Sequence, residues 1–209
     1  MTQSLDTRLA RTLCARLCHD LGGAVGSLTG TLDLVEPGEE ELLTIAQETG
    51  VVLRQRLRLY AAAWGGPTTD HDAAGLAAML GGSPASPRVR FDLDGLAPAA
   101  KLPAPIVPIA LNAALLAAEA LPRGGVVSLS GAAGGGLVVL PQGNSAAWPP
   151  PLLALLSGTP APEVLAEGPR TVLAPVLFAL LGEAGWDATL GFAGAGGRVP
   201  LLLGPVDPA

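Results

Sequence analysis

The stretch that decides the fold runs from residue 5 to residue 35 and reads LDTRLARTLCARLCHDLGGAVGSLTGTLDLV. Apolar residues recur in it every three or four positions, which is the period of one face of a helix. No proline interrupts the pattern, so it predicts one long amphipathic helix with a broad apolar side. That side consists of Leu5, Leu9, Leu13, Leu17, Leu21, Ala24, Leu28, Leu32 and Val35.

A second helix is predicted to follow after a short turn. Val35-Glu36-Pro37-Gly38 ends the first helix, because proline cannot continue it and glycine suits a left-handed exit. The next periodic segment extends from Glu39 to Trp64, and so short a connection makes the two helices antiparallel neighbours. Two helices alone cannot cover so much apolar surface, so we expect a second copy to complete a four-helix bundle. The apolar side of the second segment consists of Leu42, Leu43, Ile45, Ala46, Thr49, Val52, Leu53, Leu57 and Tyr60.

The sequence changes character after Gly65-Gly66-Pro67, which is typical of a linker. We therefore expect a helical hairpin over residues 1–66 and a second domain over residues 67–209. Short apolar runs predict strands at 88–93, 126–130, 137–140, 186–192 and 199–203, and helices are predicted at 106–120 and 171–185. Helices interleaved with short strands indicate a two-layer α/β domain, so the whole chain is predicted to be α+β.

Composition excludes several classes of protein. The 209 residues carry a net charge of −6 and no basic stripe, which argues against nucleic-acid binding. The longest uncharged stretch, residues 124–162, is broken throughout by glycine and proline, so no membrane span is expected. Asp6, Arg8 and Arg11 lie inside the amphipathic pattern, which is unlike a signal peptide. Cys14 and Cys18 lie four apart on one helix, where a disulfide would distort it; we expect buried thiols and a cytoplasmic location.

His19 lies on the opposite side of the first helix from the apolar stripe. At 100° per residue it falls about 200° from Leu17, which predicts exposure to solvent. Four glycines share its side, and each costs a helix roughly 0.5–1 kcal/mol relative to alanine. A bare track beside an exposed histidine suits the close approach of another protein. The four glycines are Gly22, Gly23, Gly26 and Gly30.

Imidazole is a nucleophile that can carry a phosphoryl group near neutral pH. Asp20 could orient the ring, and Arg16 could neutralise phosphoryl charge. Other interpretations stay open: a solvated surface histidine, a glycine track that serves only helix packing, or a metal site formed with Cys14 and Cys18. The spacing of the last set is not that of a zinc site.

The run Arg16-Leu17-Cys18-His19-Asp20-Leu21 resembles the histidine box of two-component histidine kinases. It is more similar still to the ChpT-like histidine phosphotransferases of alphaproteobacteria, which pair a helical hairpin with a degenerate kinase-like ATPase domain. Leu111-Asn112 and residues 118–125 resemble the second-domain helix and turn of that family. The resemblance implies that residues 1–66 form a dimeric hairpin for phosphotransfer and that residues 67–209 form a kinase-like domain.

Nucleotide binding is not expected in that second domain. Asn112 matches the first asparagine of the helix that holds Mg²⁺ and nucleotide in kinases of this fold, but Leu116 stands where the second should be. Pro141-Gln142-Gly143-Asn144-Ser145 stands where those kinases need Asp-x-Gly-x-Gly. We therefore expect no cofactor of the protein's own, with Mg²⁺ supplied by a partner receiver domain.

The resemblance implies a relay in which His19 accepts a phosphoryl group from the receiver domain of a hybrid histidine kinase. His19 would pass it to response-regulator receiver domains, while the protein acts as a homodimer. Two alternatives remain: an ATP-dependent histidine kinase, and a non-catalytic scaffold or inhibitor. His71 receives no role. By family analogy, a receiver helix would dock on Gly22, Gly23, Gly26 and Gly30, with Leu42, Leu43, Ile45, Ala46 and Thr49 opposite.

Overall fold

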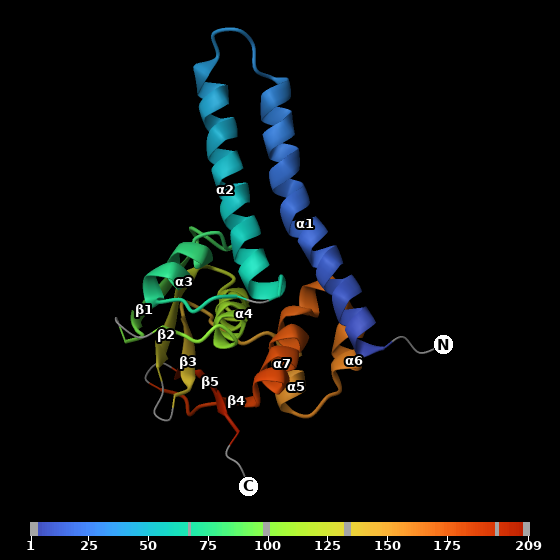
Figure 1. The fold of residues 1–209 in the computed structure, drawn as a ribbon, viewed down its shortest axis with the longest axis vertical. Coiled ribbons are helices and arrows are strands. Elements are labelled where there is room, and N and C mark those ends of the chain that lie inside the picture. Colours follow the sequence, from blue (N-terminus) through green and yellow to red (C-terminus); the bar gives the residue numbers. More distant parts are fainter. Residues whose placement is uncertain (1–3, 67, 98–100, 132–134, 195–196, 207–209) are drawn as a thin grey trace.

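The computed structural model describes residues 4–66, 68–97, 101–131, 135–194 and 197–206. Two long antiparallel helices, α1 (Leu5–Asp33) and α2 (Glu40–Trp64), form a hairpin that rises from a mixed domain (Figure 1). The Ser4 hydroxyl caps α1 by accepting a hydrogen bond from the Thr7 amide at 3.3 Å. Gly38 has a φ of +100° in the turn, a conformation that favours glycine. Both predicted helices and the break between them are confirmed.

The mixed domain contains a five-stranded sheet in the order β1-β2-β3-β5-β4. Strands β1 and β2 are parallel, and the other neighbours are antiparallel. All five predicted strands are found, with ends within two residues of the prediction. Their bounds are β1 (Val89–Gly95), β2 (Gly125–Gly131), β3 (Leu137–Gln142), β4 (Trp186–Leu190) and β5 (Leu201–Pro205).

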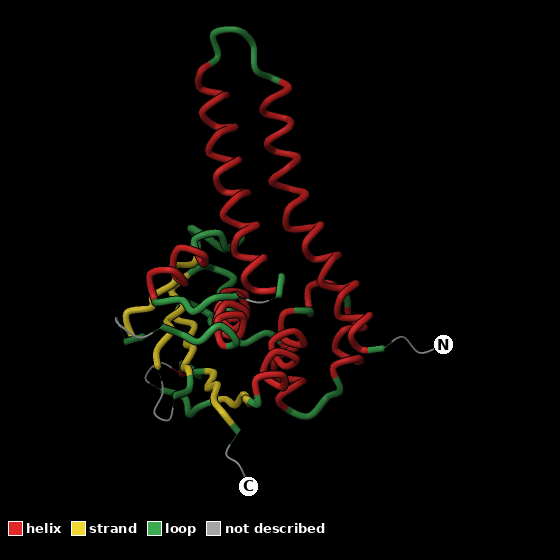
Figure 2. Tube along the Cα trace, viewed as in Figure 1, coloured by secondary structure: helices red, strands yellow, loops and turns green. Residues whose placement is uncertain are grey.

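Helices cover one face of this sheet, which gives the two-layer arrangement in Figure 2. Strand residues alternate accordingly: Val127 and Leu129 of β2 are fully buried, whereas Ser128 between them is not. Helix α4 lies at the centre and is buried along most of its length. Helices α3, α5 and α6 were not predicted. The helices of the domain are α3 (Ala73–Leu80), α4 (Ile106–Glu119), α5 (Pro150–Leu156), α6 (Ala161–Val164) and α7 (Leu173–Ala184).

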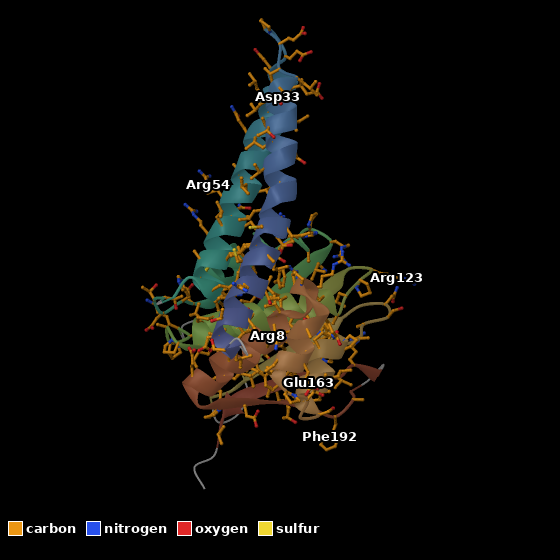
Figure 3. All side chains as sticks on the ribbon, turned by 90° about the vertical axis from the view of Figure 1, so that its right-hand side faces the viewer. Arg8, Asp33, Arg54, Arg123, Glu163 and Phe192 are labelled. Carbon is orange, nitrogen blue, oxygen red and sulfur yellow. The ribbon has the colours of Figure 1, made fainter. Side chains whose placement is uncertain are left out.

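The lower part of α1 is packed against this domain. Leu9 and Leu13 contact a small cluster of Leu165, Val172 and Val176, and Leu17 and Leu21 reach the main core. The Arg8 guanidinium donates a hydrogen bond to the carbonyl oxygen of Pro162 at 2.7 Å. The upper part of the hairpin, between the labels Arg54 and Asp33 in Figure 3, stands clear of the domain.

The free part of the hairpin keeps several large apolar side chains in solvent. This exposure agrees with the expectation that two helices cannot cover their own apolar surface. Cys14 and Cys18 are exposed as well, so the prediction of buried thiols is wrong for the single chain. Both cysteines lie at the edge of the apolar stripe of α1 rather than on it. No helix among the described residues is long and apolar enough to span a membrane. The exposed apolar residues of this part are Val25, Leu32, Leu34, Leu43, Ile45, Val51 and Val52, and Leu57 follows them nearer the domain.

Candidate functional site

His19 projects from α1 into solvent, with 75% of its side chain exposed. The residues two before and two after it, Leu17 and Leu21, pack against the main core. Because positions two apart on a helix point about 200° apart, burial of these leucines forces the imidazole outward. The exposure predicted from helical geometry is confirmed.

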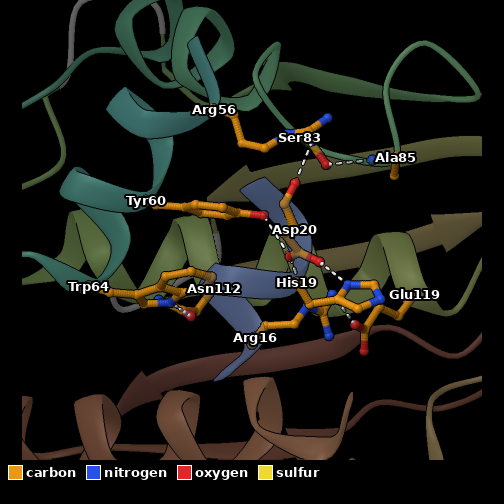
Figure 4. A network of polar contacts seen from close by, with 10 residues as sticks. All are labelled: Arg16, His19, Asp20, Arg56, Tyr60, Trp64, Ser83, Ala85, Asn112 and Glu119. Carbon is orange, nitrogen blue, oxygen red and sulfur yellow. Dashed lines mark hydrogen bonds and ion pairs between the residues drawn. The ribbon is translucent and has the colours of Figure 1, made fainter. Parts of the chain in front are cut away.

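Asp20 holds one edge of the imidazole ring. Its Oδ1 lies 3.2 Å from His19 Nδ1, and its Oδ2 accepts hydrogen bonds from Arg16 Nε at 2.8 Å and from the Tyr60 hydroxyl at 2.7 Å (Figure 4). Only 10% of the Asp20 side chain is exposed. The two oxygens are thus divided between one bond to the ring and two bonds that fix the carboxylate.

Arg16 connects the hairpin to the second domain. Its Nε contacts Asp20, and its Nη2 lies 3.0 Å from Oε1 of Glu119 at the end of α4. The sequence suggested that Arg16 would neutralise phosphoryl charge. In the structure its guanidinium is instead engaged by two carboxylates, since one helical turn separates it from Asp20 and α4 ends beside it.

The electrostatics of this cluster follow from burial and charge pairing. Burial would raise the pKa of Asp20, but hydrogen bonds from Arg16 and Tyr60 outweigh it and lower that pKa below its ordinary value. Burial raises the pKa of Glu119, opposed by Arg16. Burial and the bond to Asp20 raise the pKa of the Tyr60 hydroxyl. At neutral pH Asp20 is therefore an ionised acceptor and Tyr60 a neutral donor.

Helix α2 supports the same turn of α1 from the other side. Arg56 Nη1 donates to the backbone carbonyl of Asp20 at 2.9 Å, one turn before Tyr60. The Tyr60 ring is stacked on Trp64, with centroids 4.3 Å apart and planes inclined by 17°. These contacts fix the antiparallel register of the hairpin at the level of Asp20.

His19 opens onto a cleft of about 830 Å³ between α1 and the second domain. Arg16, Glu119, Trp148 and Arg170 also line it. Arg170 is exposed and comes from the segment before α7. Of the two arginines among the described residues that line the cleft, Arg170 is the exposed one, whereas the Arg16 side chain is only 17% exposed. The sequence did not reveal the position of Arg170.

The glycine track beside His19 is bare. A Cβ placed on any of its members would meet no heavy atom within 4 Å apart from the neighbouring backbone of its own helix. On α2, Ile45 is 42% exposed and Leu43 is 43% exposed, whereas Leu42 and Thr49 are partly buried. Ala46 is only 4% exposed because it faces α1, so its prediction as a partner contact is wrong. The members of the track are Gly22, Gly23, Gly26 and Gly30.

Asn112 performs a structural task inside the protein. It is fully buried, its Oδ1 accepts from Trp64 Nε1 at 2.8 Å, and its Nδ2 donates to the carbonyls of Ala63 at 3.2 Å and Pro108 at 2.8 Å. Its polar groups are thus occupied by α2 and α4 themselves. Gln142, in the segment compared with the kinase Asp-x-Gly-x-Gly turn, donates to the Ser128 hydroxyl at 2.7 Å.

Cys14, Cys18 and His19 do not form a metal site in the part of the chain that the structure describes, where no three His, Cys, Asp or Glu side chains cluster suitably. Sequence reasoning missed Tyr60 and Glu119. Tyr60 was counted with the apolar stripe of α2, and Glu119 was quoted only as part of a resemblance. The phenolic hydroxyl at the end of the apolar stripe of α2 was the signal for Tyr60, and the sequence held no comparable signal for Glu119.

Comparisons with known proteins agree with this architecture. The family described as "Histidine phosphotransferase C-terminal domain" matches residues 74–194. A solved bacterial phosphotransferase is 23% identical, covers 97% of this chain and 98% of its own, and superposes with a TM-score of 0.75, which shows the same fold. No curated protein matches the chain.

Two histidine kinases are more distant. The kinase domain of a blue-light activated histidine kinase from Erythrobacter litoralis is 13% identical, with 88% of this chain and 95% of that one covered and a TM-score of 0.38. Histidine kinase AdeS from Acinetobacter baumannii is 12% identical, with 90% and 94% covered and a TM-score of 0.37.

Proposed function

Because this chain belongs to the histidine phosphotransferase family, we propose that it relays a phosphoryl group between receiver-domain aspartates through His19. The family supports a phosphotransfer role in signalling and two-component partners. The observation that carries the finer proposal is an exposed imidazole whose Nδ1 is held by an ionised carboxylate.

The chemistry follows from this geometry. An ionised Asp20 can only accept, so the neutral ring keeps its proton on Nδ1 and presents the Nε2 lone pair to the cleft. That lone pair attacks the phosphorus of an aspartyl phosphate, and the P–O bond to the aspartate breaks to leave a free carboxylate. Asp20 stabilises the positive charge that develops on the ring. Attack by a second receiver's aspartate on phospho-His19 reverses these changes.

The partner brings the remaining groups in this proposal. Receiver domains of a hybrid kinase and of response regulators would dock on the glycine track, with their own Mg²⁺ at the phosphoryl group. Arg170 supports the approach of a phosphoryl group, because it adds accessible positive charge to the cleft that holds His19. We place the relay in the cytoplasm.

A homodimer is the second part of the proposal. The exposed apolar residues of the free hairpin, among them Val25, Val51 and Val52, would be covered by the hairpin of a second copy. In the four-helix bundle so formed, the second domain lies at the base of the hairpin. The cleft beside His19 is not part of the proposed dimer interface.

The relay is tested with two receiver domains that exchange no phosphate when mixed alone. One receiver is phosphorylated with label and freed from its kinase, and the protein is then added with the second. We expect label to pass through the protein to the second receiver. Label that reaches the second receiver equally fast without the protein contradicts a relay. Label taken up from ATP without any receiver supports the histidine-kinase alternative instead.

A further inference from the structure

Helix α4 makes two separate connections to the turn that carries His19. Glu119 and Asn112 are seven residues apart, which is two helical turns and places them on one side of α4. Glu119 contacts Arg16 at 3.0 Å. Asn112 accepts a hydrogen bond from Trp64 at 2.8 Å.

Both connections end on the same carboxylate oxygen. From Glu119 the first passes through the Arg16 guanidinium to Oδ2 of Asp20. From Asn112 the second passes through the Trp64 indole and the Tyr60 ring stacked on it, whose hydroxyl also donates to Oδ2. Figure 4 shows the two routes converging on Asp20 from opposite sides.

Because both routes end on Oδ2, they determine which oxygen of Asp20 is available to His19. A carboxylate that rotates freely offers either oxygen to many donors, including water. With Oδ2 held by two donors, Oδ1 is left for His19 Nδ1. In water the neutral histidine side chain favours the proton on Nε2, so a fixed acceptor at Nδ1 is needed to reverse that preference.

We propose that α4 is a two-point positioning element of the phosphotransfer site. Glu119 acts through Arg16, and Asn112 acts through Trp64 and Tyr60; together they hold Asp20 so that His19 keeps Nε2 free. The second domain is thus part of the site. The inference rests on the proposed function only for the identity of His19 as the phosphoryl carrier.

Three variants of the full chain test this role, and two of them, Glu119→Gln and Tyr60→Phe, keep nearly the whole volume of the side chain. Glu119→Gln removes the charge that holds Arg16, Tyr60→Phe removes the donor to Asp20, and Trp64→Phe keeps an aromatic ring but removes the donor to Asn112. Glu183→Gln is the matched control, because Glu183 is an exposed carboxylate on α7. Circular dichroism and thermal unfolding show which variants are folded.

The first readout is the tautomer of His19, measured from ring ¹⁵N shifts. The chain contains two histidines, so His71→Ala assigns both signals. We expect the Nδ1–H tautomer to dominate in the wild type and in Glu183→Gln. In Glu119→Gln, Tyr60→Phe and Trp64→Phe the population should shift toward Nε2–H. A purely structural role would leave the tautomer unchanged.

The second readout is the rate of label transfer from a phosphorylated receiver at saturating and limiting concentrations. We expect the saturated rate to fall roughly tenfold in Glu119→Gln and Tyr60→Phe, with little change in half-saturation, because the nucleophile rather than the docking surface is disturbed. Folded variants with the wild-type tautomer and rate overturn the positioning role. Label on a His19→Ala protein overturns the proposed function instead, and the tautomer measurement still stands.

Discussion

Nη2 of Arg16 lies 3.0 Å from Oε1 of Glu119, and this contact joins α1 to α4 although the two residues are 103 positions apart in the chain. The same guanidinium contacts the carboxylate next to His19. The second domain is therefore linked through Arg16 and Asp20 to His19, the residue proposed to be phosphorylated. This contact gives the second domain a task beyond supporting the hairpin.

The connection through Asn112 should also matter for stability. Asn112→Ala leaves the partly buried Trp64 indole N–H and the buried Ala63 carbonyl without this partner, so we expect the free energy of unfolding to fall by about 2–3 kcal/mol. Urea titration followed by circular dichroism measures it. Asn144→Ala, at an exposed loop asparagine, should change the value by less than about 0.5 kcal/mol. Equal midpoints for the two variants would contradict a buried polar connection.

Bulk added to the glycine track should block docking and spare the fold. A side chain at Gly26 meets open space in the chain, so Gly26→Trp should remain folded but lose receiver binding. Gly182→Trp, on α7 with equally open surroundings, should bind normally. Titration with a labelled receiver domain measures both. Unchanged affinity in Gly26→Trp argues against docking at the track.

The hairpin should dimerise through its exposed apolar residues. Val52 is 45% exposed in the single chain, so Val52→Asp should not disturb one chain but should place a charge in the proposed bundle. We expect light scattering to give twice the 20.8 kDa chain mass for the wild type and one chain mass for this variant. Leu153→Asp on α5 is the control and should stay dimeric. A wild-type protein of one chain mass contradicts the dimer.

Acid should remove the stabilisation that Asp20 provides. Its folded-state pKa lies below the ordinary value of 3.8, so its contribution is complete above that pH and is lost as pH falls through the lowered pKa. The stability difference between wild type and Asp20→Asn should therefore be larger at pH 5 than at pH 2.5, as measured by urea unfolding. Asp33→Asn, on the same helix, is the matched control. A difference that does not change with pH would show that the Asp20 carboxylate is not stabilised by the fold.

Helices and strands could be predicted from the sequence where their apolar residues follow a regular pattern. The leucine stripe of α1 fixed both the helix and the outward direction of His19, and all five strands followed from short apolar runs. Helix α3 was missed because eight residues with Gly75 in their interior give a weak periodic signal. Tertiary contacts decide the remainder: no local pattern could show that Glu119 reaches Arg16, whereas the burial of Ala46 agrees with its place on the apolar side of α2.

Phosphorylation of His19 itself is the most direct test of the account. The wild type, His19→Ala and His71→Ala should be incubated with a phosphorylated receiver domain and analysed at neutral pH by mass spectrometry of intact protein and peptides. The account predicts one acid-labile phosphoryl group on His19 in the wild type and in His71→Ala, and none in a folded His19→Ala protein. Phosphorylation of His19→Ala to the wild-type extent, or of another residue in the wild type, would contradict it.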